Sequence, residues 1–336
     1  MIEALFYTKN NDKSVTCSLC GHGCIIKEGK RGICEVRENI NGVLYSLNSD
    51  LLISSASDPI EKKPLYHFLP GSTAFSIAAM GCNLKCSFCQ NSSISQVSSK
   101  EPVEGQKISW SDIILAAKRS NASSIAYTYS EPTVFYEMVK GVGMIARQEG
   151  FKNILVTNGF MSDVVAHEML SFIDGANVDL KFFNNENYKK LTNGDLEKVK
   201  SSIEIFAHAD SFHLEITTLL IPGINDTVDE LVNMASWIAS LDINIPWHIS
   251  RFFPQYKMLD KSSTTKDTLE LAYRIGKEQG LKYVYLGNVH DRDREHTYCH
   301  KCEKAVIKRT GYWIDDININ DGFCKYCGTE VSGVWK

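Results

Sequence analysis

Residues 80–91 read MGCNLKCSFCQN and gather Cys82, Cys86 and Cys89 in one short loop. The apolar run before them, AFSIAAM, is typical of a buried strand, so the loop is expected at the carboxyl end of that strand. A closed zinc or iron–sulfur site normally takes four protein ligands. Three thiolates therefore either borrow a distant fourth ligand, as in a zinc site, or leave one metal position open for a small molecule.

Short apolar, β-rich runs recur through the middle of the chain, and amphipathic segments of helical length separate most of them. Alternation of this kind predicts βαβ units around a parallel sheet. Because six or seven repeats are too few for a full eight-stranded barrel, we expect an α/β fold with a partial (β/α)6 TIM-type barrel. The predicted strands are residues 74–80, 123–129, 153–159, 176–182, 212–221, 246–252 and 283–289.

Polar groups follow several of these predicted strands. In parallel αβ barrels the active site lies at the carboxyl ends of the strands, on the loops that lead into the helices. We therefore expect one mouth that gathers the central cysteines. The other groups expected there are Glu131, Asn158, Asp179, Lys181 and the Pro222–Gly223 turn.

The eleven cysteines fall into three groups with none left over. Two C-x2-C pairs near the C-terminus have the spacing of a zinc ribbon or rubredoxin-like site, and structural zinc is favoured over a single redox iron. Near the N-terminus, four thiolates in a short segment predict another closed site, for which zinc is favoured over a second iron–sulfur cluster. The two sets are Cys299, Cys302, Cys324 and Cys327, and Cys17, Cys20, Cys24 and Cys34.

These groups suggest three segments: a cysteine-rich N-terminal segment with its connection (1–73), the barrel (74–290) and a small ribbon-like module (291–336). An apolar content of 43%, a net charge of −4 and a pI near 6.2 are those of a soluble globular protein. They give no electrostatic reason to expect binding to nucleic acid or to an anionic membrane. The start of the chain lacks the pattern of a secretory signal, so we expect a cytoplasmic protein whose cysteines bind metal rather than form disulfides.

The central pattern, C-x3-C-x-Φ-C with Phe88 before the last cysteine, resembles the signature of the radical SAM superfamily. The resemblance implies a 4Fe–4S cluster on the three cysteines, with S-adenosylmethionine at the open iron and Phe88 beside it. It also implies an electron donor such as flavodoxin or ferredoxin. One-electron cleavage of the sulfonium would then give a 5′-deoxyadenosyl radical.

Two more segments carry this resemblance, and each has a plainer interpretation. Glu131 resembles the acid of the superfamily's GGE segment, which contacts the cofactor's ammonium group, although a Tyr-Ser pair replaces both glycines. The alternative is a helix start with Ser130 as the N-cap. LIPGIND resembles a segment that lies beside the adenosine, or it is a Pro222–Gly223 turn into a helix capped at Asn225 or Asp226.

The segment VDLK, residues 178–181, resembles the DLK segment of the enzymes that activate pyruvate formate-lyase, which implies cofactor contacts by Asp179 and Lys181. A mutually paired Asp–Lys couple is the alternative. VTNGF resembles their DTNGF, but Val156 stands where an Asp helps to bind a cation, so a cation site is not expected. Asn158 is then either a cofactor contact or part of a turn.

The order of seven segments resembles that of the radical SAM proteins of the AmmeMemoRadiSam system, a branch of the pyruvate formate-lyase activating-enzyme-like group. They are CSLCGHGCIIKEGKRGICEVREN, DPIEKKPLYHFLPGS, MGCNLKCSFCQN, YTYSEPT, VDLK, IPGIND and SRFFPQYKM. The resemblance covers nearly the whole chain and implies Memo-like and AMMECR-like partner proteins, but no known substrate. Weak substrate-site candidates are Lys62, Lys63, His67, His248 and Arg251.

Three classes of function remain open. The leading hypothesis is an enzyme whose deoxyadenosyl radical abstracts hydrogen from a protein or small-molecule substrate, with activation of a glycyl radical enzyme as the specific alternative. A non-catalytic metal-handling or scaffold protein would hold metal at the same cysteines without turnover. RNA modification, with the C-terminal module gripping RNA, is disfavoured by the acidic charge balance.

Overall fold

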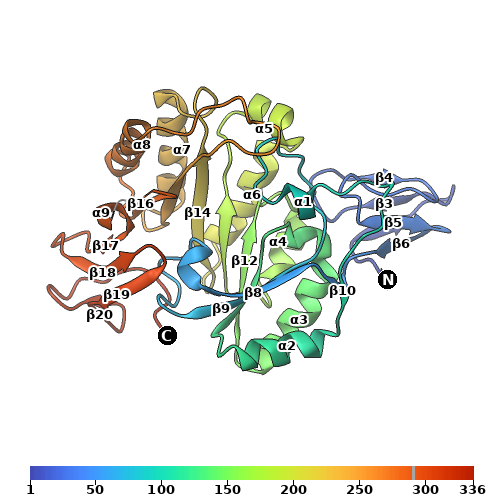
Figure 1. Ribbon diagram of the computed structural model, residues 1–336, viewed down its shortest axis with the longest axis horizontal. Coiled ribbons are helices and arrows are strands. Elements are labelled where there is room, and N and C mark those ends of the chain that lie inside the picture. The colour runs from blue at the N-terminus through green and yellow to red at the C-terminus, as the bar shows by residue number, and fades with distance from the viewer. Residues whose placement is uncertain (290–291) are drawn as a thin grey trace.

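The computed structural model describes residues 1–289 and 292–336 and is built around one eight-stranded sheet (Figure 1). Neighbouring strands lie in the order β16-β15-β14-β13-β12-β11-β9-β8. All pairs from β9 to β16 are parallel, whereas β8 pairs antiparallel with β9. The bounds are β8 Ser54–Pro59, β9 Thr73–Ala78, β11 Ser124–Tyr127, β12 Lys152–Thr157, β13 Gly175–Asp179, β14 His213–Leu220, β15 Trp247–Arg251 and β16 Val284–Gly287.

All seven apolar runs identified in the sequence form strands of this sheet, which confirms an α/β fold with a parallel sheet. The antiparallel strand β8 comes from the segment assigned to the N-terminal part, so that segment adds an edge strand to the main sheet. The curvature into a partial barrel and the three-segment division stay predictions. The proposed boundary at 290–291 lies outside the described residues.

Helices separate the parallel strands and begin at well-formed caps. The side chains of Ser109, Thr227 and Thr265 each accept a hydrogen bond from the backbone N–H three residues later. Each of the longer helices then turns a stripe of buried apolar residues towards the sheet. Their bounds are α1 Ser92–Ser95, α2 Trp110–Arg119, η2 Pro132–Phe135, α3 Tyr136–Gln148, α4 Asp163–Met169, α5 Asn185–Thr192, α6 Leu196–Ala207, α7 Val228–Leu241, α8 Lys266–Glu278 and α9 Arg292–Glu295.

Alternate residues of each strand face the helices or the opposite side of the sheet. On β14, Thr218 Oγ1 lies 3.2 Å from Met234 Sδ of α7 and accepts a hydrogen bond from Trp247 Nε1 at 3.0 Å, so its side faces the helices. Glu215, an odd number of residues away, lies on the inner side. On β13 the same alternation turns Asp179 inward, because its neighbour Val178 packs towards α6.

Glu215 is the hub of a buried polar cluster on that inner side. Its carboxylate accepts hydrogen bonds from the backbone N–H groups of Tyr66 and His67, at 3.0 and 2.7 Å. It is also bonded to the rings of His213 and His248, at 2.9 and 2.6 Å. Burial alone would raise the pKa of Glu215, but these two histidines hold it well below its usual range. The cluster fixes the segment before β9 against β14 and β15.

The segment EKKPLYHFL, residues 61–69, anchors the C-terminal module to the sheet. Glu61 lies 3.7 Å from the guanidinium of Arg309, and both side chains are fully buried. The ring of His67 contacts the Ser332 carbonyl oxygen and the Tyr285 hydroxyl, each at 2.6 Å. Neutral His67 satisfies both contacts if Nδ1–H donates to Ser332 and Nε2 accepts from Tyr285. The segment therefore joins the C-terminal module to the central sheet.

A buried ion pair attaches the N-terminal strands to the opposite side of the sheet. Arg37 donates to Glu137 of α3, and the two side chains are only 1% and 3% exposed. Arg37 also donates to the Leu5 carbonyl at 2.8 Å, and the Leu5 N–H donates back to Glu137 at 2.8 Å. The strands involved are β1 Ile2–Glu3, β2 Tyr7–Lys9, β3 Val15–Cys17, β4 Ile25–Ile26, β5 Arg37–Ile40 and β6 Val43–Ser46.

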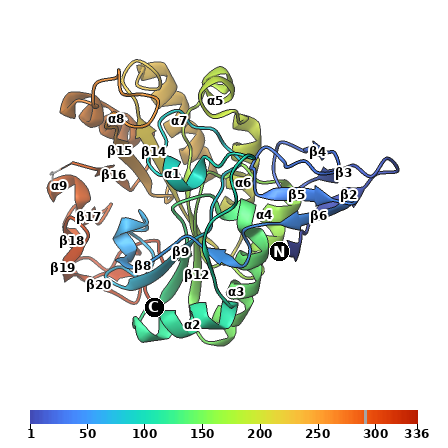
Figure 2. The same ribbon diagram turned by 45° about the vertical axis from the view of Figure 1, so that its right-hand side comes forward.

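The two cysteine-rich ends of the chain lie on opposite sides of the central sheet and its helices (Figures 1 and 2). The C-terminal part comprises β17 Thr297–Tyr298, β18 Ala305–Thr310, β19 Trp313–Ile317, β20 Ile319–Asn320 and β21 Phe323–Cys324. A short pair, β7 Leu51–Leu52 and β10 Gln106–Lys107, lies between the N-terminal strands and α2. Within the described ranges, no helix is both long and apolar enough to cross a membrane.

We predict that His67 makes folding sensitive to acid. Burial lowers the pKa of His67 to about 3, whereas in the unfolded chain it titrates near its usual value of about 6.5. Its contribution is therefore fully present above about pH 6.5 and falls by up to about 1.4 kcal/mol per pH unit as the pH drops below that value. Denaturant unfolding at several pH values should show a shallower acid slope for His67→Asn than for the wild type.

The matched control is His208→Asn, because His208 is exposed at the end of α6 and its ring contacts the Glu204 backbone carbonyl of the same helix. This control should keep the wild-type slope. Equal slopes in the wild type and His67→Asn would contradict the prediction.

Candidate functional site

The central cysteine loop is held by backbone hydrogen bonds to segments far away in the sequence. Lys85 N–H donates to the Thr192 carbonyl at 2.7 Å, and Ser87 N–H donates to the Leu191 carbonyl at 3.1 Å, both at the end of α5. The Ser87 carbonyl in turn accepts from Lys257 N–H at 2.9 Å. The loop between β9 and α1 is thus fixed before any ligand binds.

Each of the three thiol groups of this loop has a hydrogen-bond partner or a positive charge nearby. Leu84 N–H lies 3.3 Å from Cys82 Sγ, and the Ser95 hydroxyl lies 3.1 Å from Cys89 Sγ. Burial raises the pKa of Cys86 to about 12, and the positive charge of Lys181 opposes that shift. Thiolates that bind iron need donors and nearby positive charge, so these three cysteines fit an iron–sulfur cluster.

Sulfur spacing supports the same fit. Among the described residues, the three central sulfurs do not lie within 4.8 Å of one another, the spacing at which three or more side chains could share one ion. In an iron–sulfur cluster each thiolate binds a different iron, so the sulfurs stand further apart than around a single ion. The spacing of the central sulfurs is therefore compatible with a cluster.

Glu131 follows β11 and is 1% exposed. Its Oε1 accepts from the N–H and hydroxyl of Thr133, at 3.0 and 2.6 Å, and from the Thr157 hydroxyl at 2.7 Å. Its Oε2 accepts only from Asn158 N–H, at 2.9 Å among the described residues, so this oxygen has room for a further donor. Burial raises the pKa of Glu131 while these four donors lower it.

The capping alternative for this segment is correct in kind but assigned to the wrong residue. Glu131 itself is the N-cap of η2, with Pro132 at the first helical position. The hydroxyl of Ser130, the predicted cap, instead donates to the Ala79 carbonyl just after β9. Glu131 therefore orders the ends of β11 and β12 and keeps one acceptor position open.

Asn158, after β12, connects that strand to the cysteine loop. Its Nδ2 donates to Asn83 Oδ1 at 2.9 Å and lies 3.6 Å from Cys82 Sγ, while its Oδ1 accepts from Phe160 N–H at 2.8 Å. The turn predicted here is present, because Gly159 has φ +67°. The side chain thus both shapes the turn and supports Cys82.

Asp179 and Lys181 form the predicted ion pair, with Lys181 Nζ 2.9 Å from Asp179 Oδ2. Asp179 is 39% exposed, whereas Lys181 is 13% exposed. Burial alone would lower the pKa of Lys181, but Asp179 and Cys86 raise it. Phe88 is buried edge-on against Phe182, 5.7 Å between ring centres, so it packs beside the same strand end.

Two buried polar atoms beside this pair have no hydrogen-bond partner among the described residues: Asn177 Oδ1 and Thr217 Oγ1. Asn177 precedes Asp179 by two residues on β13, and Thr217 is paired with Asp179 in the sheet register. Unpaired buried polar atoms are uncommon in folded proteins. Their position on the inner side of the sheet is where a polar ligand would satisfy them.

The Pro222–Gly223 turn follows β14, and Asn225 fixes it. Asn225 Oδ1 accepts from Ile221 N–H at 2.7 Å, and its Nδ2 donates to the Lys181 carbonyl at 2.8 Å. The cap of α7 is Thr227 rather than Asn225 or Asp226, because Asn225 is engaged in this contact. The loops after β13 and β14 are therefore joined directly.

Sequence reasoning missed a polar cluster that involves Tyr129. Its hydroxyl donates to Asp58, which also forms a 2.6 Å ion pair with Lys63, and its carbonyl accepts from Asn91 Nδ2 at 2.8 Å. Tyr129 has φ +66°, a strained conformation for a bulky residue, in the place of a superfamily glycine. The only sequence signal for it was the replacement of that glycine.

The weak substrate candidates have other partners. Lys62 and Lys63 both pair with Asp58, while His67 and His248 belong to the Glu215 cluster. Arg251 donates to the Thr264 carbonyl at 2.9 Å. These contacts account for the five residues without a substrate.

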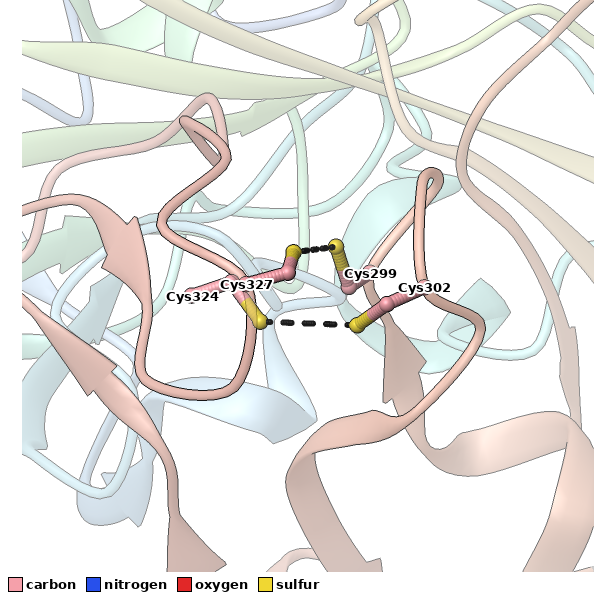
Figure 3. Close-up of side chains that lie close together, drawn as sticks. All are labelled: Cys299, Cys302, Cys324 and Cys327. Carbon is pink, nitrogen blue, oxygen red and sulfur yellow. Dashed lines mark hydrogen bonds between the residues drawn. The ribbon is translucent and has the colours of Figure 1, made fainter.

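The C-terminal cysteines have the geometry of a single-ion site. Figure 3 shows their four sulfur atoms facing one another from two loops. Cys299 Sγ lies 3.6 Å from Cys327 Sγ, and Cys302 Sγ lies 3.7 Å from Cys324 Sγ. Sulfurs bound tetrahedrally at about 2.3 Å lie about 3.8 Å apart. This group can therefore hold a metal ion.

The chain belongs to the radical SAM superfamily. The family model described as "Radical SAM superfamily" matches residues 77–238, from the end of β9 into α7. The chain is 40% identical over 334 residues to an uncharacterized protein of Methanocaldococcus jannaschii, with 98% of this chain and 99% of the other covered. The family implies an enzyme of the radical SAM class with a 4Fe–4S cluster and S-adenosylmethionine.

More distant relatives share only part of the chain. A 7-carboxy-7-deazaguanine synthase of the same organism is 26% identical over 136 residues, which are 36% of this chain and 54% of that protein. A radical SAM methyltransferase from Sphaerobacter thermophilus has a TM-score of 0.52 at 15% identity, covering 65% of this chain and 67% of the other. Streptococcus suis SuiB bound to S-adenosylmethionine has a TM-score of 0.51 at 13% identity, covering 69% and 53%. Both structures share the fold.

We predict that the C-terminal cysteines bind one metal ion whose loss affects only that module. Cys302→Ser should remove about one metal per chain and lower the denaturation midpoint of the module, because a closed four-sulfur site contributes folding energy. Metal analysis of the anaerobically purified protein measures the first effect. His300→Asn, within the same loop but outside the sulfur set, should keep the metal. Full metal content in Cys302→Ser would show that the sulfurs do not share an ion.

Proposed function

We propose that this protein reductively cleaves S-adenosylmethionine at a 4Fe–4S cluster held by Cys82, Cys86 and Cys89, and that the resulting radical abstracts hydrogen from a protein or small-molecule substrate. The observation that carries the proposal is the pre-fixed three-cysteine loop beside buried Glu131 and Lys181. When bound, the cluster supplies one electron to the sulfonium, and cleavage gives methionine and a 5′-deoxyadenosyl radical.

The chain's own groups would bind and orient the cofactor. The free acceptor position on Glu131 Oε2 suits an ammonium group, which forms a charge-assisted hydrogen bond there. Lys181, whose raised pKa keeps it protonated, suits a carboxylate or a nearby thiolate charge. The unpaired Asn177 Oδ1 and Thr217 Oγ1 offer polar contacts deeper on the inner side.

The deciding assay is anaerobic reconstitution followed by reduction with dithionite and detection of 5′-deoxyadenosine. Wild type should form it, and Cys86→Ala should not, because removing one of three thiolates removes the cluster. Ser87→Ala is the matched control, since Ser87 contributes mainly its backbone to the loop. Equal product from Cys86→Ala and wild type would overturn the proposal, and no product from either would favour a metal-handling protein.

We predict that Glu131→Gln weakens cofactor binding without loss of the cluster. An amide cannot offer an ionised acceptor, so the dissociation constant for S-adenosylmethionine should rise about 10-fold or more. Calorimetric titration measures the affinity, and iron analysis shows that the cluster remains. Thr133→Ala removes only the hydroxyl donor to Oε1 and should change affinity less. A larger effect from Thr133→Ala would assign Glu131 a purely structural role.

We also propose that the protein belongs to the AmmeMemoRadiSam system, with Memo-like and AMMECR-like proteins as partners and structural zinc at the C-terminal cysteines. Its support is the order of the seven segments along the chain and the anchoring of the C-terminal module by EKKPLYHFL. Size-exclusion chromatography of the chain with each candidate partner tests it. Activation of a glycyl radical enzyme stays the specific alternative, and a glycyl radical signal formed on a candidate partner would favour it.

A further inference from the structure

The N-terminal cysteines lie in one short segment at the end of the molecule opposite the C-terminal module. Cys17 ends β3, Cys24 precedes β4, and Cys17 N–H donates to the Cys24 carbonyl at 2.9 Å. A Cβ placed on Gly32 would lie 3.8 Å from Cys24 Sγ and 3.9 Å from Cys34 Sγ, so both sulfurs border the space beside this glycine. Cys17 and Cys34 are buried, whereas Cys20 and Cys24 are half-buried.

The spacing of these sulfurs differs from that of the C-terminal set. In the part of the chain that the structure describes, the C-terminal set is the one group of three or more potential ligands within 4.8 Å of one another. The N-terminal cysteines share a segment yet stand further apart, as the central three do. Thiolates on different irons of a cluster stand further apart than four thiolates on one zinc ion, so this arrangement is compatible with a cluster.

A buried positive charge lies beside this group. Arg37 Nη1 is 4.0 Å from Cys17 Sγ, and the same guanidinium is paired with Glu137. A closed four-thiolate cluster carries net negative charge, which becomes more negative on reduction. A fixed cation at this distance therefore stabilises the reduced form more than the oxidised one.

The N-terminal cysteine segment packs directly on both sides of Cys82. His22, between Cys20 and Cys24, contacts the Asn83 carbonyl through Nε2 at 2.7 Å. A Cβ on Gly81 would lie 3.3 Å from the Cys34 carbonyl and 2.7 Å from Val36 Cγ1, so only glycine fits this approach. Gly81 also has φ +108°, which other residues rarely adopt.

Phe160 completes this contact between the two cysteine groups. Its ring lies 4.8 Å from the ring of His22, and its carbonyl accepts from Asn83 Nδ2 at 2.8 Å. Cys20 itself forms a β-bridge with Met161. One layer of residues therefore separates the N-terminal and central groups, whereas the C-terminal module lies on the far side of the sheet (Figure 1).

We propose that Cys17, Cys20, Cys24 and Cys34 hold a second iron–sulfur cluster that passes electrons to the central one. This inference rests on the proposed function for its electron acceptor. A flavin or iron–sulfur donor protein loses one electron to the N-terminal cluster, which then passes that electron to the central cluster. No bond is made or broken and no proton moves in this transfer. The donor would approach beside Cys24, which is half-buried.

The first test counts acid-labile sulfide after anaerobic reconstitution of the full chain. Wild type should hold about eight sulfides per chain, and the Cys82→Ala/Cys86→Ala/Cys89→Ala variant should keep about four. The sulfide content decides between the alternatives, because a site with a single zinc or iron ion contains no acid-labile sulfide. A triple variant with zinc and no sulfide would overturn the proposal. If that variant does not fold, about four sulfides in the wild type would overturn it equally.

The second test compares reductants by EPR. Reduced flavodoxin should reduce the central cluster of the wild type, but not that of Cys20→Ala/Cys24→Ala, while dithionite should reduce both. Flavodoxin should also reduce the remaining cluster of the triple variant. Equal flavodoxin rates in the wild type and the double variant would make the N-terminal cluster structural and contradict the relay. If the double variant loses its central cluster, failure of flavodoxin to reduce the triple variant is the contradicting result.

The two proposals fail separately. A wild type with about eight sulfides whose EPR spectrum and product analysis show no response to S-adenosylmethionine would remove the proposed function and leave the second cluster standing. Cleavage of S-adenosylmethionine by a wild type with about four sulfides would remove the second cluster alone.

Discussion

Parallel pairing from β9 to β16 is the constraint on which the candidate site depends, because it brings the carboxyl ends of distant strands to one edge. Asn158 at the end of β12 then reaches Asn83 and Cys82 after β9, and Glu131 after β11 receives the N–H of Asn158. Each contact joins segments that are far apart in sequence. A shift in register of one residue would turn inward groups such as Asp179 towards the helices.

The sequence predicts the strands well because their runs are long, apolar and separated by amphipathic segments. It also groups the cysteines, since spacing along the chain limits which sulfurs can meet. It does not predict β8 as an antiparallel edge strand, because the polar run SSASDP has no strand periodicity. The left-handed backbone conformation of Tyr129 is not predicted either, because the fold rather than the residue type imposes it.

Some residues allow both a structural and a functional interpretation, and only the structure shows the partners that decide between them. Glu131 is both the cap of η2 and the holder of an open acceptor position, so the structural role and the ligand role are compatible. The His248 ring contacts Glu215, and the His67 ring contacts Ser332 and Tyr285. No local sequence pattern connects these partners to the two histidines. The role of a charged residue inside a sheet therefore cannot be assigned before its hydrogen-bond partners are known.

The three cysteine groups differ in the spacing of their sulfurs, and this spacing limits what each group can bind. The C-terminal sulfurs are close enough to share one ion, and the module that carries them is attached by Arg309 and His67. The segments that carry the central and N-terminal cysteines contact each other through His22 and Asn83.

The most direct test of the central claim is electron–nuclear double resonance of the dithionite-reduced protein with S-adenosylmethionine labelled with 15N in its amino group and 13C in its carboxylate. The account predicts hyperfine coupling from both labels to the cluster, because these groups fill the iron position that three cysteines leave open. It also predicts that the coupling disappears in Cys86→Ala. A reduced cluster whose spectrum shows no coupling to either label, and does not change when the cofactor is added, would contradict the account.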